Sequence, residues 1–155
     1  GRGAAGRGVG AARAGVRTGA RMRRLGAMQS LFEGAMYIFV LQWPPALIGA
    51  IRGGAVPFGK VFSCLMACCM IGSSLFSALS RRLAVETSAV AMLGAATAAM
   101  ALATVAPTSL PALIAAFFVF EVCVGLYFPS IGTLRSKYAT GAPTPGARAN
   151  ILGGS

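Results

Sequence analysis

The sequence contains very few acidic residues and no histidine. Its 155 residues include three glutamates, no aspartate and no histidine, against 14 lysines and arginines. These absences exclude a histidine-based catalytic dyad, a histidine metal site and chemistry that needs paired aspartates. Charged residues make up 11% of the chain, whereas a soluble domain carries about 25%. So few charges cannot cover the surface of a water-soluble monomer of this composition.

The four cysteines do not form a recognisable metal or redox motif. They all lie in long apolar stretches, and no histidine is available to complete a ligand set. We therefore interpret Cys64, Cys68, Cys69 and Cys123 as small packing residues. The sequence also offers no nucleophile–base pair, so it predicts no enzyme, no cofactor and no metal.

The first 24 residues are almost entirely glycine, arginine and alanine, with seven, seven and six of each. They show no apolar periodicity, which predicts a disordered cytoplasmic segment over residues 1–24. A basic segment attracted to anionic lipid and an organelle transit peptide remain alternatives. Nucleic-acid binding is not expected, because the tract has no aromatic residue to stack on bases.

After Arg24 the sequence becomes apolar. Residues 34–51, 61–80 and 87–120 carry no charge. A helix that spans the bilayer needs about 20 mostly apolar residues, and four stretches provide them: about 26–49, 58–80, 84–106 and 112–134. These runs are too long for barrel strands and do not alternate. The sequence therefore predicts an all-α polytopic transmembrane helix bundle over residues 25–134, followed by a cytoplasmic loop over residues 135–155.

The basic residues predict the orientation of this bundle. If the helices alternate in direction, the N-terminal tract, the Arg81–Arg82 turn and the C-terminal segment share one face and carry 12 bases. The opposite face has only Arg52 and Lys60. The positive-inside rule then places both termini in the cytoplasm. We expect an integral multi-pass protein, in the plasma membrane rather than in an organelle.

Two glutamates fall inside predicted spans, Glu33 in the first and Glu121 in the fourth. An acid in the hydrocarbon is costly and normally faces a cavity, a partner or a proton path, and apolar surroundings favour its neutral form. The alternative is a structural glutamate that pairs with an arginine or a hydroxyl group from a helix outside this chain. Glu86 lies beside the Arg81–Arg82 turn, where a boundary ion pair or a helix-start charge is expected.

Residues that disturb helices accompany both acids. These predicted helix breaks are Gly34, Pro44, Pro45, Gly125 and Pro129. Interrupted helices beside polar groups are typical of transport sites, because freed backbone groups can line a cavity. Glycine and proline are also frequent in ordinary membrane helices.

Polar residues in the first span repeat at helical spacing. Gln29, Glu33 and Tyr37 are four residues apart, so one helix face could carry all three. We expect the first and fourth helices to face an aqueous cavity, with Gln29, Tyr37 and Tyr127 as candidate lining residues and the middle two helices packed behind them.

The two strings that carry these acids resemble the molybdate-anion transporter family of the major facilitator superfamily. They are residues 29–40 (QSLFEGAMYIFV) and 120–130 (FEVCVGLYFPS), and residues 62–66 (FSCLM) and 71–75 (IGSSL) fit the same alignment. The resemblance covers about residues 26–138 and implies a fragment, helices seven to ten of twelve. Residues 148–152 resemble the start of an eleventh helix. The loop signature of the superfamily is mostly missing, since Phe76 stands at its aspartate position.

The resemblance implies secondary active uptake of molybdate. Moving a dianion inward against −100 mV costs about 4.6 kcal/mol, at about 2.3 kcal/mol per charge. Two co-transported protons cancel this cost, so Glu33 and Glu121 are candidate proton carriers. No base lies in the middle of a predicted span, so the main ligands of the anion are expected outside this chain.

The implied partners are the substrate oxyanion, the lipid bilayer and the remaining helices of the transporter. Two alternatives remain open. One is a major facilitator carrier of another small solute, such as a sugar or an organic anion, and the other is a membrane scaffold subunit that transports nothing.

Overall fold

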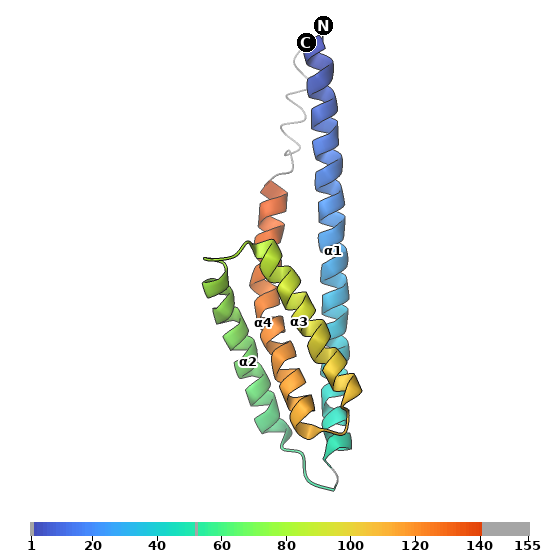
Figure 1. Ribbon diagram of the computed structural model, residues 1–155, viewed down its shortest axis with the longest axis vertical. Coiled ribbons are helices and arrows are strands. Elements are labelled where there is room, and N and C mark those ends of the chain that lie inside the picture. Colours follow the sequence, from blue (N-terminus) through green and yellow to red (C-terminus); the bar gives the residue numbers. More distant parts are fainter. Residues whose placement is uncertain (1, 52, 141–155) are drawn as a thin grey trace.

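The computed structural model describes the backbone of residues 2–51 and 53–140 and the side chains of residues 19–51 and 53–138. Four helices make up most of it: α1 (Arg2–Ala50), α2 (Phe58–Leu79), α3 (Val85–Val105) and α4 (Leu110–Thr140). No strand occurs in these ranges, which confirms the predicted all-α bundle. The helices alternate in direction. The start of α1, the α2–α3 turn and the end of α4 lie at one end, and the other two connections lie at the opposite end (Figure 1).

Each of the four helices is long and apolar enough to cross a membrane. The 22 residues of α2 and the 21 of α3 correspond to about 33 and 32 Å of helix, close to the hydrocarbon thickness of about 30 Å. These two helices coincide with the predicted spans 58–80 and 84–106 to within one residue at each end. The chain is an integral, multi-pass membrane protein.

The structure differs from the sequence prediction at the outer ends of α1 and α4. Residues 2–24 belong to α1 instead of being disordered, and residues 135–140 continue α4 instead of beginning a loop. Alanine and arginine are good helix formers, and a span that is already helical spares the extension the cost of nucleation. The 49 residues of α1 measure about 74 Å, so this helix projects beyond the others (Figure 1). The predicted eleventh-helix start at residues 148–152 lies outside the described residues.

The predicted helix breaks are wrong. Gly34, Pro44 and Pro45 lie within the continuous helix α1, and Gly125 and Pro129 lie within the continuous helix α4. Each proline removes a single N–H donor from the ladder of backbone hydrogen bonds, and membrane helices tolerate that loss. These residues therefore leave the helices whole.

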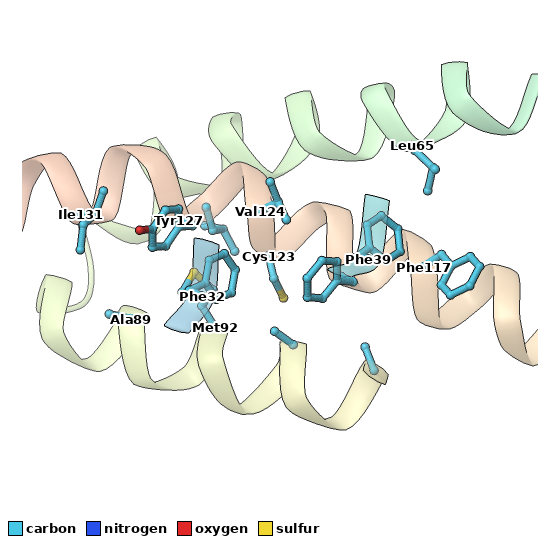
Figure 2. Close-up of a cluster of buried hydrophobic side chains, with 14 of the residues drawn as sticks. Phe32, Phe39, Leu65, Ala89, Met92, Phe117, Cys123, Val124, Tyr127 and Ile131 are labelled. Carbon is cyan, nitrogen blue, oxygen red and sulfur yellow. The ribbon is translucent and has the colours of Figure 1, made fainter. Parts of the chain in front are cut away.

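Helix α4 is the centre of the bundle. It packs against α1, α2 and α3, whereas contacts among those three helices are sparse. In its most apolar stretch, 56% of the residues are buried, compared with 28% or less in each of the other helices. Figure 2 shows the side chains that meet α4, with Phe32 and Phe39 from α1, Leu65 from α2, and Ala89 and Met92 from α3.

Two glycines bring the backbones of α2 and α4 into contact. A Cβ atom at Gly72 would lie 2.1 Å from the Val122 carbonyl oxygen, and one at Gly125 would lie 2.0 Å from the Cys69 carbonyl oxygen. The Ser73 hydroxyl group donates a hydrogen bond to the Gly125 carbonyl oxygen at 3.1 Å. Gly125 is thus a close-packing residue, as is usual where membrane helices cross closely.

Candidate functional site

The interface between α1 and α4 is built on aromatic rings. Phe32 stacks on Tyr127 with ring centroids 4.4 Å apart, and Phe39 lies 4.7 Å from Phe120 and 5.3 Å from Phe117. The two α1 rings are seven residues apart, two turns along one helix face. This packing fixes the rotation of α1 about its axis, and with it the direction of the polar residues beside Phe32.

Four polar side chains form a hydrogen-bonded network across this interface. The Gln29 amide Nε2 donates to Glu33 Oε1 at 2.7 Å, and the Tyr127 hydroxyl group donates to the same oxygen at 3.1 Å. Arg135 Nη2 donates to Gln29 Oε1. We call Gln29, Glu33, Tyr127 and Arg135 the Glu33 network. It joins α1 and α4 through side chains.

The end of the bundle that holds the α2–α3 turn and the end of α4 carries most of the basic residues, and we call it the basic end. The Glu33 network runs from this basic end toward the interior of the bundle. Arg135 is exposed, Gln29 and Glu33 are partly buried, and Tyr127 is 1% exposed. Tyr127 and Arg135 are eight residues apart on α4, about 12 Å of helix rise. A buried tyrosine hydroxyl group needs a hydrogen-bond partner, and Glu33 supplies it. The network therefore places a carboxyl group inside the membrane part of the bundle with two donors aimed at it.

The structure brings together only part of the set predicted from sequence. Gln29, Glu33 and Tyr127 meet. The hydroxyl group that donates to Glu33 is that of Tyr127, so it belongs to this chain and not to a helix outside it. Tyr37 is 74% exposed and does not reach the network. Each four-residue step advances about 40° around a helix, so the second step has turned Tyr37 away from α4.

Glu121 lies on a different side of α4. It is 6% exposed and stands one turn from Gly125, on the face toward α2. Its carboxyl group is close enough to the Cys68 and Cys69 thiols to interact with them electrostatically. Among the described residues, no hydrogen bond reaches this carboxyl group. The two membrane acids therefore occupy separate places.

At the basic end of the bundle, Glu86 forms the expected ion pair. Lys137 Nζ lies 2.6 Å from Glu86 Oε1, and the Tyr138 hydroxyl group donates to the same oxygen at 3.4 Å. The pair links the first turn of α3 to the last turns of α4. Within the residues that the structure describes, no cluster of three or more metal-ligating side chains occurs.

A groove separates α1 from α3. It consists of two adjoining cavities of about 770 and 640 Å³, which share Ala35, Met100 and Thr104 as lining residues. Phe117 and Phe120 of α4 lie beneath them. The walls are almost entirely apolar, and none of the Glu33 network lines them. This groove is thus a surface for apolar groups and not the aqueous cavity expected from the sequence.

Sequence reasoning missed two residues of importance. The sequence shows Arg135 only as one of the bases of the C-terminal segment. It is, however, the first base after the apolar part of α4, which makes it the cation of that segment closest to the interior of the bundle. The sequence places Gly72 only within the matching string 71–75 (IGSSL). Its neighbours Cys69 and Ser73 are also small, which is the pattern of a close helix contact.

Comparison with known proteins gives a consistent result. A family profile described as sugar transporters with twelve transmembrane segments matches residues 8–127. Proteins named molybdate-anion transporter from Takifugu rubripes, Danio rerio and Xenopus tropicalis are each 33% identical over 124 residues, covering 76% of this chain. The chain spans about a quarter of the length of these relatives. No solved structure matches it.

Proposed function

Since this chain belongs to the molybdate-anion transporter family of the major facilitator superfamily, we propose that it forms helices seven to ten of a secondary active transporter that takes up molybdate. Its role is the movement of a solute and not the catalysis of a reaction. The names of three relatives support the substrate. The observation that supports a transport role is the position of Glu33. This acid lies inside the membrane part of the bundle and accepts hydrogen bonds from Gln29 of α1 and Tyr127 of α4.

Uptake of a dianion needs a compensating positive charge, and Glu33 and Glu121 are our proposed proton carriers. Inward movement against −100 mV costs about 4.6 kcal/mol for two charges, which two protons cancel. Glu121 is buried and accepts no hydrogen bond from the described residues, so its carboxyl group has no other partner to lose when it takes up a proton. A protonated glutamate also does not repel the anion.

We propose that the basic end of the bundle faces the cytoplasm of a cell whose plasma membrane holds the protein. Arg21, Arg82, Arg135 and Lys137 gather at that end, whereas Lys60 is the only base described at the other end. This asymmetry is the one that the positive-inside rule associates with cytoplasmic loops. The remaining helices of the transporter would cover the apolar groove between α1 and α3, whose small lining residues permit close helix packing.

The test is uptake of radiolabelled molybdate by the complete transporter in a transport-deficient cell, measured at several external pH values. We expect saturable uptake that rises as the pH falls and is lost in Glu33→Gln and Glu121→Gln. Glu86→Gln is the matched control, because Glu86 lies in a boundary ion pair, and it should transport normally. If uptake is unchanged in both Glu33→Gln and Glu121→Gln, these two residues are not the proton carriers. No uptake from correctly inserted protein would remove the molybdate assignment.

A second candidate function is the transport of a sugar. The description of the family profile supports it, and the Glu33 network offers both hydrogen-bond acceptors and donors suited to hydroxyl groups. Competition separates the two candidates. An excess of unlabelled sugars should leave molybdate uptake unchanged if the oxyanion is the substrate, and uptake of a labelled hexose that survives excess molybdate would favour the sugar.

A further inference from the structure

We propose that Arg135 is a positioning residue, which acts through Gln29 to set how readily Glu33 takes up and releases a proton. The inference rests on the proposed function, because it concerns how proton binding at Glu33 is coupled to uptake of the anion. It goes beyond that function because it assigns a role to an exposed residue near the end of α4 and specifies the route by which this residue acts.

The first step is the orientation of the Gln29 amide. Its oxygen accepts a hydrogen bond from Arg135, and its nitrogen donates to Glu33. A guanidinium group can only donate, so it selects the orientation in which the amide oxygen faces Arg135. The NH₂ group is then directed at Glu33. Without Arg135, the amide is free to rotate, and the Gln29–Glu33 hydrogen bond loses its support from α4.

The second step is the pattern of hydrogen bonds at Glu33. Both donors, Gln29 and Tyr127, reach Oε1, whereas Oε2 accepts no hydrogen bond from any residue that the structure describes. A proton can therefore bind Oε2 while Oε1 keeps both donors as a carbonyl oxygen. The network holds in both protonation states, but the donors stabilise the charged form more. Losing either donor makes the carboxylate less stable relative to the acid.

The third step concerns the charged and titratable groups around Glu33. On α4 these are Tyr127 and Arg135, and on α1 the neutral Gln29 lies one turn away. In the described parts of α2 and α3, no titratable group forms a hydrogen bond or an ion pair with Glu33. Lys137, the other base near the end of α4, is paired with Glu86. Arg135 is thus the cation whose removal should be felt at Glu33.

The experiment measures the pH profile of molybdate uptake by the complete transporter carrying Arg135→Leu, Gln29→Leu or both. Each single substitution should move the midpoint of the uptake profile to higher pH, because the Gln29 donor to the charged carboxylate is lost or no longer held toward it. If Arg135 acts through Gln29, the double variant shifts no further than either single one. Arg135→Lys should recover most of the wild-type profile. Arg82→Leu, which removes an exposed base at the same end of the bundle, is the matched control and should not move it.

Additive shifts in the double variant would overturn the proposal, because Arg135 would then act on Glu33 as a charge through space. An unchanged midpoint in the single variants would overturn it as well. Infrared titration of the purified transporter in vesicles gives a readout that needs no transport. The carboxylic-acid band that Glu33→Gln removes should titrate with the same shifts in the same variants. If molybdate uptake is absent, the proposed function fails while this band still decides the role of Arg135.

Discussion

Helix α4 meets α2 and α1 in two different ways. Against α2 the contact is between backbones, with Gly72 and Gly125 so close that neither has room for a methyl group. Against α1 the contact is between side chains, the aromatic rings of Phe32 and Phe39 and the hydrogen bonds of the Glu33 network. The first interface has no polar side-chain network among the described residues, and the second has one that reaches the basic end of the bundle.

The comparison teaches which parts of the bundle are fixed relative to one another. Helix α2 cannot slide along α4 without driving side chains into carbonyl oxygens, because only the two glycines permit the approach. Rings and hydrogen bonds can re-form after a small rotation, since each side chain has several rotamers. We therefore expect α2 and α4 to move as one unit during a transport cycle, and α1 to change its position relative to them.

The largest expected effect is at the glycine contact. Gly125→Ala places a Cβ atom against the Cys69 carbonyl oxygen, so α2 and α4 must separate, and the free energy of unfolding should fall by about 3 kcal/mol. Unfolding of the complete protein in sodium dodecyl sulfate, followed by circular dichroism, measures this. The control is Gly94→Ala, which meets nothing within 4 Å and should be neutral or slightly stabilising. Equal stability of all three proteins would refute the backbone contact.

A smaller loss is expected at the aromatic interface. Phe32→Ala removes contacts with the Tyr127 and Phe120 rings and should cost about 2 kcal/mol, less than in water because lipid is as apolar as the core. Met70 on α2 is 72% exposed and does not line the groove between α1 and α3, so Met70→Ala should have little effect in the same unfolding experiment. A loss as large as that of Gly125→Ala would mean that the two interfaces do not differ in the way described.

Next in size is the hydrogen bond between the two helices of the Glu33 network. Tyr127→Phe keeps the buried ring and removes only the donor to Glu33, so stability should fall by about 0.6 kcal/mol, the average for such bonds in membrane proteins. The same variant should raise the midpoint of the uptake pH profile, as Gln29→Leu does. Tyr138→Phe is the matched control, since its hydroxyl group makes only a long contact of 3.4 Å with Glu86. A midpoint that moves to lower pH would contradict the arrangement.

The smallest effect is expected at the link between α3 and α4. The Glu86–Lys137 pair has side chains 40% and 56% exposed, and exposed pairs contribute below about 1 kcal/mol. Lys137→Gln should therefore lower stability by no more than about 0.5 kcal/mol. High salt should lower the free energy of unfolding of the wild-type protein by the same amount and leave that of the variant unchanged, because salt screens exposed charges. A salt-independent loss would show that Lys137 contributes by packing.

The helices themselves could be predicted from sequence because uncharged runs of sufficient length have one stable structure in a bilayer. Their outer ends could not, since Gly/Arg-rich residues 2–24 extend a helix whose nucleus lies elsewhere. The Gln29–Glu33 hydrogen bond was within reach of helical spacing alone. The contacts of Tyr127 and Arg135 depend on how α1 and α4 are rotated against each other, which only packing determines. A glycine such as Gly125 is compatible both with a broken helix and with a close contact between two helices. The sequence does not show that the backbone of α2 lies opposite Gly125, so it could not decide between the two.

The central position of α4 has a consequence for the order of assembly. A membrane protein is synthesised from its N-terminus, so α1, α2 and α3 enter the bilayer before α4 exists. With sparse contacts among themselves, these three helices gain little by associating and remain as separate inserted segments. The arrival of Leu110–Thr140 supplies the surface on which all three pack, so the bundle forms in one late step. Within this four-helix segment, a chain interrupted before Leu110 would leave α1, α2 and α3 without the surface on which they pack.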